Sequence, residues 1–377
     1  MFDCTVPNNT LSRAELSYDE GTVLNVHYGD VLIKYGSVLD VQKDDIPRIP
    51  YRCREDFNGA LLQDGDVIIA DTAEDETTGK ACEIGNLQGR AIVSGLHTMV
   101  CRPRHRMALG YLGHYLNSNA YHHQLLPLMQ GIKVLSLSRS NIQKTSVSYP
   151  TVEKEQQLIA NYFSQLDNLI TLHQRKYDKL TNVKKSMLEK MFPQNGSNVP
   201  EIRFKGFTEA WEQRKVSELF KVTRGYVLAA TLTEPAKTDE MPYPVYSSQT
   251  KDNGLMGYYK DYLYEDAITW TTDGANAGTV NYRAGKFYCT NVCGVLLSNE
   301  VTANQMIAEA LNNVAKGYVS YVGNPKLMNN VMADIEIMIP THAEEREKLS
   351  VFFRNLDTLI TLHQRKPNFY TGGYYAE

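Results

Sequence analysis

One octapeptide occurs twice in this chain. Residues 169–176 read LITLHQRK, and residues 359–366, which lie 190 positions further on, read LITLHQRK again. The match continues upstream in register and without a gap, so that Pro150 corresponds to Pro340 and Phe163 to Phe353. An identical octamer within a weaker aligned match indicates a duplicated structural unit, and such a repeat constrains the fold before any other feature does.

Both copies have the apolar pattern of a long helix. Apolar residues recur at alternating steps of four and three, which is the 3.5-residue period of a coiled-coil seam. Two unrelated amphipathic helices in two cores are the alternative, but core packing alone does not produce identical octamers. The seam histidines have no neighbouring motif for metal binding or catalysis, so we interpret them as hydrogen-bonded residues that set the register. The predicted seam is Ile159, Phe163, Leu166, Ile170 and His173 in the first helix and Leu349, Phe353, Leu356, Ile360 and His363 in the second.

Turn and capping residues indicate where these helices begin and end. Pro150 followed by Thr151 suits a helix start, and Pro193 suits a stop. The first helix is therefore expected over residues 151–192, with a length of about 60 Å at 1.5 Å per residue. The second is expected over 341–366 and is shorter, because Pro367 stands where Tyr177 continues the first pattern.

A block of mixed secondary structure precedes each helix, at residues 1–150 and 211–340. Short β-branched runs between turn residues predict strands in both blocks. Residues 193–210 form a polar linker, and residues 367–377 form a tail without a pattern. The order of block, helix, linker, block and helix predicts an α+β chain with two mixed α/β domains and two long helices. Strands are expected at 31–33, 66–70, 91–93, 98–100, 266–270, 287–288, 294–297 and 335–339, strand-like alternation at 131–150, and helices at 107–126 and 304–312.

Composition limits the class of protein. A chain of 377 residues with 42% hydrophobic and 22% charged residues suits a soluble globular protein of at least two domains. The chain has no apolar run of 18 residues and no secretory signal, and six cysteines without a disulfide framework suit the cytoplasm. The net charge of −4 argues against a protein that coats nucleic acid indiscriminately, but it allows a local basic face.

Motifs for catalysis are missing from the sequence. It contains no phosphate-binding loop, no GxGxxG, no Asn-Pro-Pro-Tyr-like tetrapeptide and no Glu-x-Lys. Cys289 and Cys293 are four residues apart, but no second pair completes a zinc site. We therefore predict no catalytic residues, no metal site and no cofactor.

Residues suited to contact with a polyanion occur in both blocks. Arginine and lysine neutralise phosphates, arginine also reads guanine, and amides and hydroxyls bond base edges. A solvated basic loop is the alternative for the arginine cluster near residue 104, and a tight hairpin is the alternative for the Gly-rich turn around residue 276. The candidates are Arg102, Arg104, His105, Arg106, Lys133 and Arg139 in the first block and Ser248, Gln249, Lys251, Asn253, Asn276, Lys316 and Lys326 in the second.

With its duplicated helices and two dissimilar blocks, the chain resembles the specificity subunit of type I restriction–modification systems. The resemblance rests on residues 155–193, 200–215 and 356–366. It implies two target-recognition domains, each reading one half of a split double-stranded DNA target, separated by two long helices that pair antiparallel. It also implies that the helices dock two modification (methyltransferase) subunits, that restriction subunits join the complex, and that the chain itself catalyses nothing.

The chain departs from this family pattern in two places. The second block opens with WEQRKVSEL at residues 211–219, and the first block has no such opening. The second helix stops at Lys366, so we expect a form that is shortened at both ends. The alternative function is a coiled-coil scaffold whose globular domains bind protein or glycan. Salt-sensitive binding to a specific DNA sequence would distinguish the family function from this scaffold.

Overall fold

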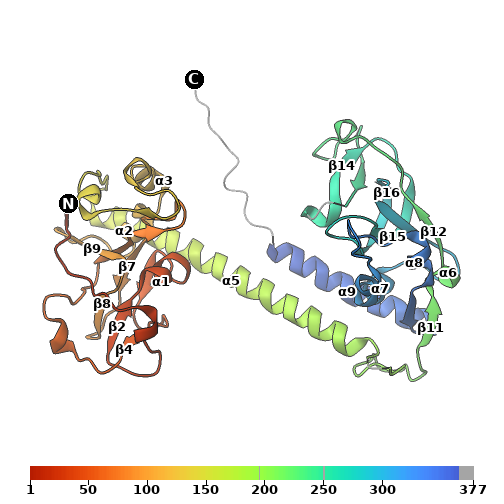
Figure 1. Ribbon diagram of the computed structural model, residues 1–377, viewed down its shortest axis with the longest axis horizontal. Coiled ribbons are helices and arrows are strands. Elements are labelled where there is room, and N and C mark those ends of the chain that lie inside the picture. The colour runs from red at the N-terminus through yellow and green to blue at the C-terminus, as the bar shows by residue number, and fades with distance from the viewer. Residues whose placement is uncertain (195, 249–250, 365–377) are drawn as a thin grey trace. The chain divides into compact units, whose positions relative to one another are not determined.

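The computed structural model describes residues 1–377 except residues 195, 249–250 and 365–377 (Figure 1). The chain divides into two compact units, Met1–Leu172 and His173–Glu377. The division falls within α5 (Glu153–Met191), a helix of 39 residues. Each unit has its own sheets and its own hydrophobic core.

The first unit is built on a five-stranded sheet with the order β1-β9-β5-β7-β3. A three-stranded sheet, β4-β2-β8, and a two-stranded ribbon, β10-β6, complete it. Both parallel and antiparallel neighbours occur, so the sheets are mixed. The strands are β1 (Phe2–Asp3), β2 (Val23–Val26), β3 (Val38–Asp40), β4 (Arg48–Ile49), β5 (Val67–Ala70), β6 (Thr72–Ala73), β7 (Ala81–Gly85), β8 (Ala91–Ser94), β9 (Thr98–Pro103) and β10 (Leu135–Ser136), and the helices are α1 (Tyr28–Ile33), α2 (Tyr111–Leu116), α3 (Asn119–His122) and α4 (Arg139–Ile142).

The second unit has a six-stranded sheet with the order β12-β17-β15-β16-β13-β14 and a two-stranded ribbon, β11-β18. Its core lies between the sheet, α7 and α9, and includes the fully buried Trp270, Phe220 and Phe353. The strands are β11 (Glu212–Lys215), β12 (Phe220–Arg224), β13 (Tyr243–Tyr246), β14 (Leu255–Tyr259), β15 (Tyr264–Thr271), β16 (Val280–Cys289), β17 (Cys293–Ser298) and β18 (Glu336–Ile339), and the helices are α6 (Val216–Leu219), α7 (Gln305–Ala315), α8 (Asn329–Asp334) and α9 (Ala343–Gln364).

The two units repeat one scheme of hydrogen bonds. In the first, the side chain of Asn117 after α2 bonds both backbone groups of Ala81 on β7, at 2.9 and 2.7 Å. In the second, the side chain of Asn312 on α7 bonds both backbone groups of Val280 on β16, at the same two distances. The same helix-to-strand clamp therefore occurs twice, and the duplication seen in the helices extends to the globular parts.

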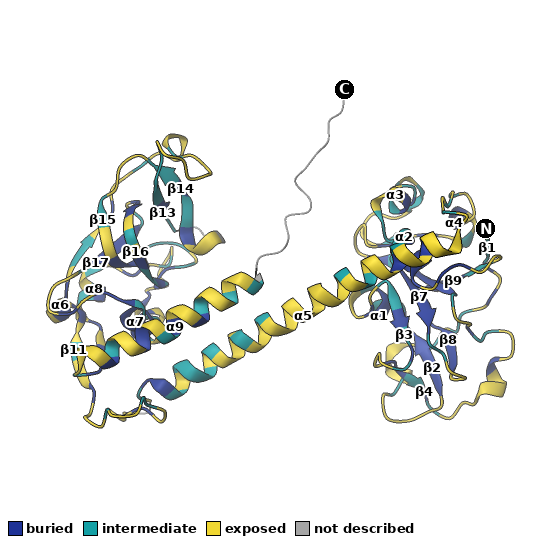
Figure 2. Cartoon of the chain, turned by 180° about the vertical axis from the view of Figure 1, so that it is seen from behind, coloured by how far each residue is buried: buried dark blue, intermediate teal, exposed yellow. Residues whose placement is uncertain are grey.

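Helix α9 packs against the second half of α5 within the second unit (Figure 2). Met191, the last residue of α5, and Phe192, which follows it, share a buried cluster with Leu349, Phe353 and Leu356 of α9. The rings of Phe192 and Phe353 are 5.6 Å apart. Burial of a side chain of this size stabilises a fold by about 1.5–3 kcal/mol, so these residues hold the helix pair on the second unit.

Lys184 connects the helix pair to the globular part of the second unit. Its Nζ lies 2.6 Å from a carboxylate oxygen of Glu309 on α7 and 2.6 Å from one of Asp357 on α9. Burial lowers the pKa of Lys184, but the two carboxylates outweigh burial and the pKa is raised. The lysine therefore stays charged and joins α5, α7 and α9 at one point.

The two octapeptides meet at their histidines. The Nδ1 atoms of His173 and His363 are 2.9 Å apart, and the residues occupy the same position in the two copies. Further along α5, Lys184 pairs with Asp357, which precedes His363 on α9, so the helices run antiparallel. Equivalent residues that face each other in antiparallel helices place a local two-fold axis between the two rings.

The first half of α5 packs on its own unit instead. Ala160 is buried in the core of the first unit, Ile159 packs against it, and the ring of Phe163 lies 5.5 Å from that of His114. Gln156 donates to the carbonyl of Pro150, just as Arg346 donates to the carbonyl of Pro340. The turn that begins each long helix is thus built in the same way.

The structure confirms the α+β class, two mixed α/β units and long antiparallel helices, and it corrects several expected elements. Residues 31–33, expected as a strand, belong to α1, because the His27 side chain accepts a hydrogen bond from the amide of Gly29 and caps a helix there. Residues 107–126, expected as one helix, contain α2 and α3, because Asn117 ends α2 where it bonds β7. Residues 131–150 contain only the short β10 and the helix α4.

The histidine pair predicts that the second unit loses stability on acidification. Partial burial and the charges of Lys176 and His173 lower the pKa of His363. The unfolded chain therefore binds this proton more readily, and stability falls as the pH drops through about 6.5, the ordinary value for histidine. We expect the thermal midpoint of the second unit to fall between pH 8 and pH 5 and the fall to be smaller in His363→Gln.

The control for this measurement is His123→Gln, which changes an exposed histidine of the first unit. It should melt with the pH dependence of the unchanged chain. An identical pH dependence in His363→Gln and the unchanged chain would show that the pair contributes nothing.

Candidate nucleic-acid interface

Three loops of the second unit meet at one end of its sheet. They are residues 247–248 and 251–254 after β13, residues 272–278 between β15 and β16, and residues 320–326 before α8. Asn276 Nδ2 donates to the carbonyl of Ser248 at 3.3 Å, and the amide of Gly274 donates to the carbonyl of Pro325 at 3.0 Å. Lys326 Nζ lies 3.7 Å from a carboxylate oxygen of Asp273. These bonds join the three loops into one surface, which we call the second loop surface.

The structure brings together most of the predicted candidates of the second block. Ser248, Asn253, Asn276 and Lys326 belong to the three loops, and Lys316 follows α7 beside the 272–278 turn. At Gly278, with φ +82°, an added Cβ would lie 2.8 Å from Val319, so only glycine allows this turn to approach the end of α7. Gln249 lies outside the described residues, as does the side chain of Lys251.

A buried arginine that sequence reasoning missed lies under the second loop surface. Arg283 on β16 donates from Nε to Thr269 Oγ1 at 3.1 Å and from Nη2 to the carbonyl of Asn253 at 2.7 Å. Its guanidinium also lies 3.7 Å from the ring centre of Tyr246. Burial lowers the pKa of Arg283, and no carboxylate pairs with it in the part of the chain that the structure describes.

The surroundings of Arg283 suit an acceptor-rich ligand. A cavity of about 110 Å³ is lined by Arg283 together with hydroxyl and amide side chains, among them Ser247, Asn276 and Asn281. Asn253, which lines this cavity, and its neighbour Asp252 have φ values of 52° and 49°, a backbone conformation that stores strain and is often found at functional sites. A buried positive charge in a polar cavity suits a phosphate oxygen or the acceptor edge of a guanine. No sequence signal marks this arginine, because its neighbours come from distant strands.

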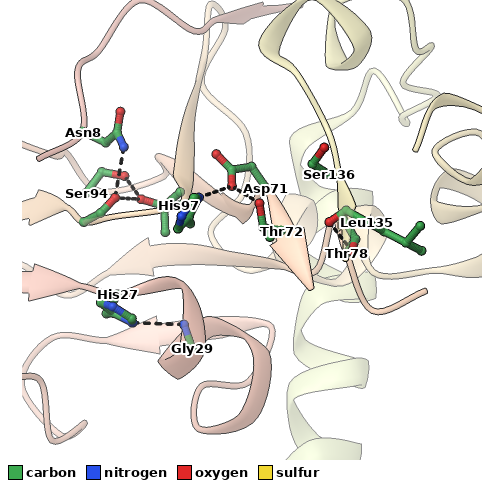
Figure 3. Close-up of polar contacts among 12 residues, drawn as sticks. Asn8, His27, Gly29, Asp71, Thr72, Thr78, Ser94, His97, Leu135 and Ser136 are labelled. Atoms are coloured by element: carbon green, nitrogen blue, oxygen red, sulfur yellow. Dashed lines mark hydrogen bonds and ion pairs between the residues drawn. The ribbon is translucent and has the colours of Figure 1, made fainter. Parts of the chain in front are cut away.

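The corresponding end of the first unit has its own polar surface (Figure 3). His97, in the turn before β9, places Nδ1 3.3 Å from Asp71 Oδ1, and Thr72 donates to that same oxygen at 2.8 Å. Asn8 Nδ2 donates to the carbonyl of Gly95 at 3.2 Å. The Ser136 end of the 130–136 hairpin, which carries Lys133, pairs with Thr72. We call this the first loop surface, and its members His97 and Asn8 were not predicted.

The arginine cluster lies elsewhere. Strand β9 begins at Thr98 beside the first loop surface, so Arg104 is six residues away, or about 20 Å at 3.3 Å per residue. Arg104, His105 and Arg106 are exposed close to the start of α5, where the amide of Ala108 donates to Gln156. The cluster is therefore near the long helix and away from Lys133.

Arg102 and Arg139 make contacts within the first unit. Arg102 forms two bonds with the carboxylate of Asp66, at 2.8 and 2.7 Å, and a third with the carbonyl of Leu61. The carboxylate of Asp66 is only 1% exposed, so this arginine neutralises a buried charge. Arg139 donates to the carbonyl of Val6 and to Asn8 Oδ1.

Comparison with known proteins identifies the family. A family model described as Type I restriction modification DNA specificity domain matches residues 53–182 and 208–369. The chain belongs to this family. Its members act as specificity subunits, which are not catalytic, and the chain is therefore not an enzyme. Among the described residues, no group of three or more potential ligands is placed to hold a metal ion, and no helix is long and apolar enough to cross a membrane.

Similar proteins occur in Mycoplasma. A Mycoplasma pneumoniae protein, named as the N-terminus of a type I specificity subunit, is 39% identical over 147 residues, which cover 38% of this chain and 75% of that protein. The Type I restriction enzyme MpnII specificity subunit of the same organism is 32% identical over 158 residues, which cover 41% of this chain and 43% of that protein. In two further M. pneumoniae relatives the match spans 39% and 36% of their length.

A solved structure has the same fold. The crystal structure of the type I restriction–modification S subunit from M. genitalium aligns with a TM-score of 0.67 at 12% identity. The alignment covers 96% of this chain and 88% of that one. The arrangement of two mixed units and long helices is therefore one that a specificity subunit adopts.

The contacts of Arg102 predict that this arginine stabilises the first unit, whereas the exposed Arg104 and Arg106 do not. In Arg102→Ala the buried carboxylate of Asp66 loses its partner, and breaking such a pair costs about 3 kcal/mol. We expect the free energy of unfolding of the first unit, measured in urea, to fall by about that amount. Arg104→Ala and Arg106→Ala, the matched exposed controls, should change it by less than about 0.5 kcal/mol.

A loss of stability in Arg104→Ala or Arg106→Ala as large as in Arg102→Ala would contradict this prediction. If the exposed arginines contact DNA phosphates, each substitution lowers the salt dependence of DNA binding by about 0.9 in log–log slope.

Proposed function

We propose that the chain recognises a bipartite double-stranded DNA target as the specificity subunit of a type I restriction–modification complex. The family match supports DNA specificity, and the observation that carries the bipartite target is the repetition of one fold with a polar loop surface at the same end of each unit. Each loop surface then reads one half of the target.

The chemistry of the loop surfaces supports direct contact with DNA. The second loop surface offers amide groups at Asn253 and Asn276, a lysine at Lys326 and the buried guanidinium of Arg283. Asparagine bonds adenine, arginine bonds guanine, and lysine neutralises phosphate. The first loop surface offers His97, Asn8 and Lys133, a different set of donors and acceptors, and so suits a different half-site.

The long helix supports a fixed connection between the two half-sites. A continuous helix of 39 residues rises about 58 Å at 1.5 Å per residue, and it carries no glycine or proline between Glu153 and Met191. A rod of this kind holds two DNA-reading units at a distance set by its length. That distance fixes the number of base pairs between the two half-sites.

The exposed face of α5 supports docking of other subunits. Tyr162, Leu169 and Leu172 are 52–61% exposed, and apolar side chains that follow one another along an exposed helix mark an interaction surface. We propose that the modification subunits, two in number, bind along the helices and that restriction subunits join through them. The complex acts in the cytoplasm, where the six cysteines, none of which forms a disulfide, are suited to stay reduced.

The proposal is tested by exchanging one domain. Residues 211–339 are replaced by the corresponding domain of another specificity subunit, and the variant is produced with its modification subunit in a strain without other type I systems. Because each unit reads its own half-site, methylome sequencing should show one half of the methylated motif changed and the other half retained.

The control is a chain in which residues 211–339 are exchanged for a recoded copy of themselves, which should leave the motif intact. A motif that changes in both halves, or in neither half, would contradict the proposal.

A further inference from the structure

A short hairpin projects from the same place in each unit. In the first unit, the backbones of Gln130 and Ser136 exchange two hydrogen bonds, at 3.0 and 2.8 Å, and close a tip of five residues. In the second unit, Ser320 and Lys326 do the same at 2.8 and 2.9 Å. Both hairpins have the same length and begin 190 positions apart, the offset of the duplicated helices.

The anchoring of the two hairpins is also the same. The amide of Leu137 donates to the carbonyl of Asp71 at 2.8 Å, and the amide of Leu327 donates to the carbonyl of Thr272 at 2.9 Å. Each hairpin leads into a short helix, α4 or α8. Each therefore leaves its unit from within the loop surface, beside Thr72 in the first unit (Figure 3) and beside Asp273 in the second.

Both tips end in a β-branched aliphatic side chain that is almost fully exposed. Ile132 is 100% exposed and Val322 is 93% exposed, and these residues occupy equivalent positions. Isolated exposed apolar residues are common and need no explanation. The segments QGIKVLS and SYVGNPK, however, share no identical residue at equivalent positions, and yet both place such a side chain at the same point of the tip. An exposed aliphatic side chain at the same position of two otherwise different hairpins is stronger evidence of a function than one exposed residue alone.

We propose that Ile132 and Val322 are apolar wedges that enter duplex DNA, each in its own half-site, and contact the faces of a base step. This inference rests on the proposed function and adds to it a contact that carries little sequence information. Apolar side chains inserted between base pairs are an established means by which proteins grip and deform DNA. A tip that is a single closed hairpin is narrow enough to enter the major groove, which admits a two-stranded β-ribbon.

The charges around the tips favour DNA over a protein partner. Lys133 follows Ile132 directly, and Lys316 and Lys326 flank the tip of Val322. Protein–protein interfaces are depleted in lysine, whereas DNA contacts are rich in it. The Nζ atom of Lys326 lies 3.7 Å from a carboxylate oxygen of Asp273. This ion pair is long and half-exposed, so a DNA phosphate can replace Asp273 as the partner of the lysine. The tips also project from the same surfaces that carry the candidate base contacts.

The test uses the chain assembled with its modification subunits and a duplex that contains the motif identified by methylome sequencing of the unchanged chain. Removing the aliphatic carbons in Ile132→Ala or Val322→Ala should weaken binding to this duplex about tenfold. The slope of log Kd against log salt concentration should not change, because no phosphate contact is removed. With 2-aminopurine placed at successive positions, the fluorescence rise that reports an unstacked base should be lost at one half-site only.

Matched variants control for chemistry and exposure. Ile132→Val and Val322→Ile keep a wedge and should bind as the unchanged chain does. Ile33→Ala and Val199→Ala remove exposed aliphatic side chains elsewhere in the same units and should also bind normally.

Two results would overturn the inference and leave the proposed function in place. One is full affinity of Ile132→Ala and Val322→Ala for a duplex that the unchanged chain binds specifically. The other is loss of modification subunits, seen by analytical ultracentrifugation, with normal DNA affinity in the complexes that still assemble, which would assign the tips to a protein partner. If the unchanged complex itself shows no preference for its motif, the proposed function fails and the wedges fail with it.

Discussion

The packing of α9 against the second half of α5 is the interaction on which the rest of the structure depends. Phe353, Leu349 and Leu356 are buried in one cluster with Met191, Phe192 and residues of α7. Lys184 then ties this helix pair to α7 through Glu309. A long helix is not stable merely by its length, since most helical stability in proteins comes from packing of an apolar face. The buried pair therefore turns the end of α5 into a rigid part of the second unit.

Each unit separates its helix contacts from its loop surface. In the second unit, α7 contacts α9, whereas the three loops meet at the ends of the strands. In the first unit, Gln156 at the start of α5 contacts the segment that follows the end of β9, and His97 lies at the other end of that strand. This separation lets the loops vary without disturbing the helices. It also explains how two units with unlike loop chemistry keep the same Asn117 and Asn312 clamps.

The sequence predicted the features that depend on local patterns. The 3.5-residue period identified both long helices, but the predicted seam is buried only in part: Leu349, Phe353 and Leu356 are buried, whereas Phe163 and Ile170 are 44% and 57% exposed. Features that depend on distant partners were not predictable. Arg283 and Arg102 look alike in the sequence, but Arg102 meets Asp66 from a neighbouring strand, whereas Arg283 has no carboxylate among the described residues and lines a cavity.

The central proposal is that α5 acts as a rigid spacer between two DNA-reading units. A copy of residues 163–169 inserted after Leu169 keeps the heptad register and lengthens the helix by about 10.5 Å, or about three base pairs. The same seven residues inserted after the exposed Gly59 serve as the control. Methylome sequencing should show both half-sites unchanged with a spacer about three base pairs longer for the helix insertion and an unaltered spacer for the control. An unaltered spacer in the helix variant, or altered half-sites, would contradict the account.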